Sequence, residues 1–114
     1  MNKGEAMARY QYVVLARAVE GRERDFDTWY DGQHITDVQN VPGVLSAKRC
    51  NVAFQKVYDL DAPKYHSMAI YEIETDDPEA FLAHIASLHG TPAMPSSDSL
   101  TKQGMIQIVG LIPA

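Results

Sequence analysis

Two strand-like segments follow one another near the middle of this chain with no helix between them, and this order constrains the fold more than any other feature. Residues 44–52 alternate apolar and polar side chains after a Pro-Gly turn. Residues 65–74 have an apolar centre and follow a charged, proline-containing connection that is typical of a long hairpin. Two strands joined in this way are expected to pair antiparallel.

The first and last strands are expected at residues 10–16 and 105–109, where β-branched and other apolar side chains dominate. In both segments the two alternating sets of side chains are largely apolar. Each strand is therefore expected to present apolar side chains on both faces of the sheet.

A first helix is expected from residue 22, where apolar side chains recur at the spacing of one helix face. Continuing one ideal helix past Gly32 would place Gln33 and Asp37 in the centre of that apolar face. The pattern therefore predicts a helix break near Gly32, because glycine tolerates the left-handed conformation that is common just beyond helix ends. Residues 34–38 would then form a separate short turn.

A second helix is expected at the segment Asp76–Glu79, which supplies an N-cap carboxylate, a proline at the first helical position and a further acid. The element order is then strand, helix, strand, strand, helix, strand. This order predicts the ferredoxin-like α+β fold, a four-stranded antiparallel sheet with both helices on one face. Because that plan leaves an apolar sheet face without a helix, we expect a second copy of the chain to cover it in a homodimer.

Length and composition are those of one globular domain. The chain has 114 residues, of which 46% are hydrophobic and 22% charged. Residues 1–8 are expected to form a disordered tail, and residues 9–114 a single domain. The net charge of −5 and the scattered basic residues argue against a nucleic-acid partner.

Nothing in the sequence indicates secretion or membrane insertion. The N-terminus lacks the pattern of a signal peptide, and the longest apolar runs are far below the roughly 18 residues that span a bilayer. The single cysteine, Cys50, cannot form an internal disulfide and has no obvious base beside it in the sequence. A cytoplasmic protein with no membrane partner is therefore expected.

The segment Trp29–Val38, with the sequence Trp-Tyr-Asp-Gly-Gln-His-Ile-Thr-Asp-Val, resembles the first helix and turn of the EthD-like proteins of the dimeric α+β barrel superfamily. Further matching segments are Val41–Val44, Ser46–Arg49 and Met68–Ile73. The likeness covers most of residues 10–112, and it implies two ferredoxin-like protomers whose sheets pack into a barrel. Thr36 stands where the family pattern usually has proline, which implies a less rigid turn after His34.

The resemblance restricts the range of possible substrates more than the range of possible reactions. The wider superfamily includes muconolactone isomerases, cofactor-free quinone-forming monooxygenases, polyketide cyclases and haem enzymes. EthD-like proteins are mostly of undefined activity, with some decarboxylases that act on aromatic polyketides. A small aromatic or polyketide-like ligand is therefore what the resemblance implies.

His34 is the candidate catalytic residue, because an imidazole with a usual pKa of about 6.5 can both give and take protons at neutral pH. It could instead fix the turn by hydrogen bonding to the backbone, but the matching position in the family favours a site role, with the ring opening toward the barrel. Tyr30 and Asp37 flank it at helical spacing, as candidates for substrate binding. Asp37 could orient the imidazole or cap the short turn, and Tyr30 could be a core residue.

Tyr71, Arg49 and Gln107 are further candidates for substrate binding. They come from the centres of expected strands, where a polar group that faces the barrel needs a ligand, water or side-chain partner. Arg49 could bind a substrate carboxylate through two parallel hydrogen bonds. It could equally face solvent or pair across the dimer interface.

The remaining histidines, His66, His84 and His89, show no metal-ligand spacing, and no phosphate loop, nucleophile elbow or nucleotide fingerprint is present. The sequence therefore predicts neither a metal nor a cofactor.

The leading hypothesis is a cofactor-free enzyme of small-molecule catabolism that acts on an aromatic or polyketide-like carbonyl compound through His34. Its reaction would be that of a lyase, such as a decarboxylase, or of an isomerase or cyclase. The alternatives are a non-catalytic protein that binds a hydrophobic ligand and a haem- or oxygen-dependent monooxygenase-type enzyme of the same fold.

Overall fold

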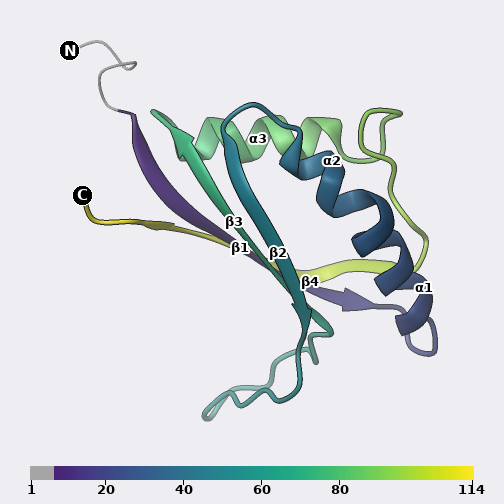
Figure 1. Cartoon of the computed structure of the whole chain (residues 1–114). Coiled ribbons are helices and arrows are strands. Elements are labelled where there is room, and N and C mark those ends of the chain that lie inside the picture. The colour runs from purple at the N-terminus through teal and green to yellow at the C-terminus, as the bar shows by residue number, and fades with distance from the viewer. Residues whose placement is uncertain (1–6) are drawn as a thin grey trace.

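Four strands form one antiparallel sheet in the order β2-β3-β1-β4 (Figure 1). The structure is a computed structural model that describes residues 7–114. The elements in chain order are β1 (Ala8–Ala18), α1 (Glu23–Trp29), η2 (Tyr30–His34), α2 (Ile35–Gln39), β2 (Val44–Asn51), β3 (Ser67–Thr75), α3 (Pro78–Leu88) and β4 (Leu100–Leu111). This arrangement confirms the ferredoxin-like α+β fold. β1 begins one residue before the expected domain start, and residues 1–6 of the expected tail lie outside the described residues.

One face of the sheet, the core face, carries the hydrophobic core. The register pairs Tyr12 of β1 with Tyr71 of β3, so buried side chains of neighbouring strands lie side by side. Phe26 of α1 and Ile85 of α3 belong to the same buried cluster. The helices therefore cover this face of the sheet, as Figure 1 shows.

The first helix is continuous, so the predicted break near Gly32 is wrong. α1, η2 and α2 follow one another without interruption, and Gly32 keeps a helical backbone within η2. η2 is a π-helical turn, in which the Ile35 N–H donates to the Tyr30 carbonyl five residues earlier rather than four. The helix thereby accommodates one extra residue.

The π-helical turn explains the sequence pattern that predicted a break. The buried side chains Phe26, Tyr30, His34 and Val38 recur at every fourth residue. In an ideal α-helix such a series drifts by about 40° per step, because four residues turn through about 400°. The wider turn of η2 takes up part of this drift, so His34 and Val38 stay on the side of the helix that faces the sheet.

The second face of the sheet, which we term the open sheet face, has no helix over it (Figure 1). Two rows of apolar side chains cross it, Met68–Leu15–Ile106 and Ile70–Val13–Ile108. Ile108 is 52% exposed and Ile106 is 37% exposed. The apolar surface expected from the sequence is therefore present. Within residues 7–114, no helix has the length and apolarity needed to cross a membrane.

Candidate active site

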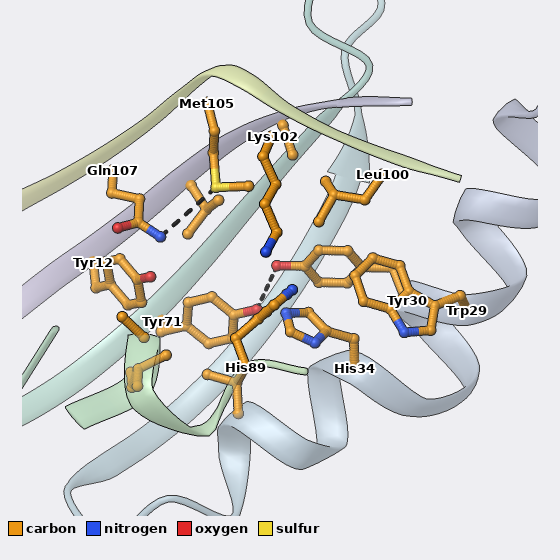
Figure 2. A pocket seen from close by; sticks show the side chains of 15 residues that line it. Tyr12, Trp29, Tyr30, His34, Tyr71, His89, Leu100, Lys102, Met105 and Gln107 are labelled. Atoms are coloured by element: carbon orange, nitrogen blue, oxygen red, sulfur yellow. Dashed lines mark hydrogen bonds between the residues drawn. The ribbon is translucent and has the colours of Figure 1, made fainter. Parts of the chain in front are cut away.

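A cavity of about 240 Å³ lies between the core face of the sheet and the helices (Figure 2). It is formed within a single chain, on the opposite side of the sheet from the open sheet face. The expectation that His34 opens toward a barrel between two chains is therefore wrong, because His34 opens into this cavity. The described residues that line it are Tyr12, Val14, Ala16, Trp29, Tyr30, His34, Val38, Tyr71, Ile85, Ala86, His89, Leu100, Lys102, Met105 and Gln107.

His34 is the last residue of the π-helical turn and is 8% exposed. Its ring stacks on Trp29, with centroids 4.5 Å apart, and meets the Tyr30 ring edge to face at 4.7 Å. Neither ring nitrogen has a hydrogen-bond partner among residues 7–114, and Nδ1 is fully buried. Aromatic packing thus holds the ring, and Nε2, which is not fully buried, is the nitrogen left for a ligand.

The protonation of His34 follows from its surroundings. Burial, with a smaller contribution from His89, lowers the pKa of His34 from 6.5 to about 4. The imidazole is therefore neutral at pH 7, with a lone pair on one nitrogen and a proton on the other. In this state His34 can accept a proton from a ligand and return it.

Tyr30 and Tyr71 bring two hydroxyl groups together at the cavity wall, with their oxygens 2.6 Å apart (Figure 2). Burial raises the pKa of Tyr30 to about 12 and raises the pKa of Tyr71 as well, so both phenols keep their protons at neutral pH. One hydroxyl donates to the other, which leaves one O–H proton with no partner among the described residues. The pair can donate that proton to an oxygen atom of a ligand.

Two residues that line the cavity were not expected there from the sequence. The His89 ring lies 5.4 Å from the His34 ring, and its Nε2 is 3.0 Å from Ser96 Oγ. Lys102 lies on β4, which begins several residues earlier than expected. Burial and the charge of Lys102 both lower the pKa of His89. Sequence spacing gave no signal for either residue, because only the folded chain brings them to His34.

Of the site residues predicted from the sequence, His34, Tyr30, Tyr71 and Gln107 line the cavity. Asp37 does not line it. Its Oδ2 atom is buried without a hydrogen-bond partner among the described residues, and no hydrogen bond joins Asp37 to His34 within that part of the chain. The imidazole is therefore oriented by its aromatic neighbours rather than by Asp37.

Arg49 lies outside the cavity and clamps β2 to the first helix. Its guanidinium donates two parallel hydrogen bonds to the Asp31 carboxylate, at 2.7 and 2.8 Å, and lies 3.2 Å from the Asp27 carboxylate. It also lies over the Tyr30 ring, 5.5 Å from the centroid, and its side chain is only 5% exposed. These donors are used within the protein, so the expected binding of a substrate carboxylate by Arg49 is corrected to a structural role.

The cavity limits what can be bound. Among residues 7–114, no three His, Cys, Asp or Glu side chains gather in a group that could hold a metal ion. The volume of about 240 Å³ is below the roughly 300–1,000 Å³ of typical sites for drug-sized ligands. The enclosed part of the cavity is therefore sized for a small ligand.

Comparison with solved structures shows the same fold in another protein. An ethyl tert-butyl ether D (EthD) family protein from Bacillus halodurans C-125 matches 90% of this chain and 96% of its own, with a TM-score of 0.54 and 20% sequence identity. No protein-family model matches the chain, and no curated protein matches it. The structural match agrees with the sequence resemblance to EthD-like proteins and, at this identity, shows the shared fold.

Replacing Arg49 by methionine is expected to destabilise the protein. The change leaves Asp31 without its cation, leaves Asp27 with only His66 and Asn51 as partners, and removes the clamp on the first helix. We expect a loss of roughly 2–3 kcal/mol in the free energy of unfolding, somewhat less than for a fully buried pair because Asp31 is partly exposed. Urea denaturation of the wild type and the variant measures this loss. Arg9→Met is the control, because the Arg9–Glu74 pair is exposed and should contribute less than about 1 kcal/mol. Equal losses in the two variants would contradict the clamp.

His34 is also expected to make stability depend on pH. Its pKa of about 4 in the folded chain lies below the usual 6.5 of the unfolded chain, so the unfolded state binds more protons in between. The stabilisation is present above pH 6.5 and is lost as the pH falls toward 4, by up to roughly 3 kcal/mol. Urea denaturation across this range should show a steeper slope in the wild type and in His84→Gln than in His34→Gln, which keeps the same-sign contribution of His89. The same slope in all three proteins would refute the assignment.

Proposed function

We propose that this chain is an enzyme that transfers a proton to and from a carbon next to a carbonyl group, with His34 as the general acid/base. The observation that carries the proposal is the placement of a buried, neutral imidazole with unpaired nitrogens in the same cavity as the Tyr30–Tyr71 hydroxyl pair. A base and a hydrogen-bond donor on one ligand site are the two groups that enolisation requires.

The reaction can be written with the groups at hand. His34 takes a proton from the carbon, the C–H electron pair forms a C=C bond, and the carbonyl π electrons move to oxygen. The unpaired hydroxyl proton of the Tyr30–Tyr71 pair hydrogen bonds to the resulting enolate oxygen. In a substrate with a C=C bond next to that carbon, return of the proton from His34 to the far end of the conjugated enolate shifts the double bond and gives an isomer. Collapse of the enolate, which re-forms the C=O bond and expels a leaving group with its electron pair, gives a lyase product.

The low pKa of His34 is compatible with this role. An imidazole with a pKa of about 4 is a weak base when no negative charge lies beside it. The enolate places a negative charge next to the ring, and an opposite charge at close range raises the pKa of an imidazole. His34 therefore becomes a stronger base as the transition state develops, which is where the added strength accelerates the reaction.

The walls of the cavity support an aromatic or polyketide-like ligand. Trp29 and Tyr12 present aromatic rings, and Val14, Ile85 and Leu100 present aliphatic side chains. A flat, unsaturated compound gains contact with all of these surfaces. A non-catalytic protein that holds such a compound would use the same walls, so the test must detect chemistry and not binding alone.

The test is exchange of carbon-bound hydrogen for deuterium. The protein is incubated in deuterated buffer with aryl ketones and aromatic β-diketones such as benzoylacetone, and NMR follows the loss of the α-proton signal. We expect the wild type to accelerate exchange above the buffer rate and His34→Gln to lose that acceleration by roughly 10²–10⁴-fold. His84→Gln, on the exposed side of α3, is the control and should match the wild type.

Two results would go against the proposal. Exchange at the wild-type rate in His34→Gln would remove the imidazole from the reaction. Binding of these compounds without any accelerated exchange would favour the non-catalytic alternative.

A second copy of the chain covers the open sheet face in this proposal. The two apolar rows form a surface that is suited to packing against a copy of itself, and charged side chains of both signs flank them. These are Arg17, Lys48, Glu72 and Glu74. A two-fold axis can bring such charges opposite one another.

Analytical ultracentrifugation tests the dimer. Ile108→Glu places a charge in the exposed apolar row and should convert a wild-type dimer into a monomer. Ala83→Glu, at an exposed position of α3, should leave the dimer intact. A wild-type chain that sediments as a monomer would rule out this interface.

A further inference from the structure

The charge of the cavity wall differs in sign from that of the chain. The chain carries a formal net charge of −5, yet no carboxylate is found among the described residues that line the cavity. Lys102 is the formally charged side chain of that set, and it forms no ion pair with any residue between 7 and 114. The site therefore offers one positive charge and several neutral donors to a ligand.

The position of Lys102 is fixed by an irregularity in β4. The paired residues Arg17–Thr101 and Leu15–Ile106 are separated by one residue on β1 but by residues 102–105 on β4. β-Bulges of this kind re-aim side chains and recur next to active sites. Figure 2 shows that the Lys102 side chain extends from β4 toward the Tyr30–Tyr71 hydroxyl pair.

The backbone of the bulge is held in place by a glycine turn and by side-chain hydrogen bonds. Gly104 adopts a left-handed backbone with φ of 81°. The Tyr65 hydroxyl donates to the Gly104 carbonyl at 2.7 Å, and Arg17 donates to the Gln103 carbonyl at 2.9 Å. The Gln103 and Gly104 carbonyls are thus held by Arg17 of β1 and by Tyr65 in the connection before β3, which fixes the backbone next to Lys102.

We propose that the cavity takes its ligand as a carboxylate, with Lys102 bound to the carboxylate and the ring of the ligand packed against Trp29. This inference rests on the proposed function for the enolisable carbonyl, which it places at the Tyr30–Tyr71 pair. Electrostatics supports an anion over the other ligand classes. A cationic ligand would be repelled by Lys102, and a neutral ligand would leave the ammonium group unused.

The assignment also selects among the reactions. A carboxylate that is paired with an ammonium group is stabilised in the bound substrate, and decarboxylation would have to give up that stabilisation on the way to its transition state. The carboxylate is therefore a handle that positions the substrate, and it is retained in the product. Proton transfer between two carbons, which is isomerase chemistry, satisfies this condition.

The binding test uses two probes that differ only in charge. Phenylacetate and phenylacetamide have the same ring and nearly the same shape, but the first is an anion at pH 7. Trp29 is the chain's single tryptophan and lines the cavity, so its fluorescence reports binding of either probe. We expect phenylacetate to bind at least tenfold more tightly at low salt, and its affinity to fall as salt is added.

Variants locate the charge that is responsible. Lys102→Met should lower the affinity for phenylacetate about tenfold and change that for phenylacetamide less than twofold. Lys56→Met is the matched control, because Lys56 lies in the exposed connection between β2 and β3, outside the cavity. Since Lys102 is exposed, both variants should unfold at the wild-type urea midpoint.

Three outcomes would overturn the inference: equal binding of the two probes by the wild type, equal effects of Lys102→Met and Lys56→Met on phenylacetate, or no binding of either probe at millimolar concentration. None of these depends on turnover. Loss of the carboxylate site is thus distinguishable from failure of the proposed function, which the exchange experiment with His34→Gln decides separately.

Discussion

The position of Tyr30 governs the rest of the site, because this side chain joins the first helix to two strands at once. Its hydroxyl lies 2.6 Å from that of Tyr71 on β3, and the Arg49 guanidinium of β2 lies 5.5 Å from its ring centroid. His34 follows one π-helical turn later and packs on Tyr30 and Trp29. The contacts of Tyr30 with β2 and β3 therefore fix the position of the helix, and with it the position of the imidazole.

Burial gives the groups of this cavity their chemical character. It favours the neutral form of every titratable group, so the same effect lowers the pKa of His34 and raises the pKa of Tyr30 and Tyr71. A neutral base and neutral donors thus lie in one space, and none of them neutralises another by proton transfer. The charge at this site is supplied by Lys102, which lies on β4 and partly in solvent.

The sequence predicted the fold well because the fold depends on local patterns. Strand periodicity and the Asp77–Pro78 helix start identify the order of elements, and the Asp77 carboxylate accepts the expected hydrogen bond from the Ala80 N–H at 3.0 Å. The apolar pattern around Gly32 does not fit one ideal α-helix, and either a helix break or a π-helical turn can explain this. The break was predicted because glycine is common at helix ends. The site was harder to predict, because the roles of Arg49 and Lys102 depend on strand register and on a bulge, and neither has a local signature.

The π-helical turn also bears on how such a site can arise and disappear. It amounts to one residue inserted into an otherwise regular helix. Removing one residue between Tyr30 and His34 would restore an α-helical turn without rotating the residues downstream, because the wider turn already absorbs the extra residue. A deletion in a regular part of the helix would instead rotate everything downstream by about 100° relative to the sheet. The π-helical turn is thus a place where the chain can gain or lose a residue beside His34 while the ferredoxin-like scaffold persists.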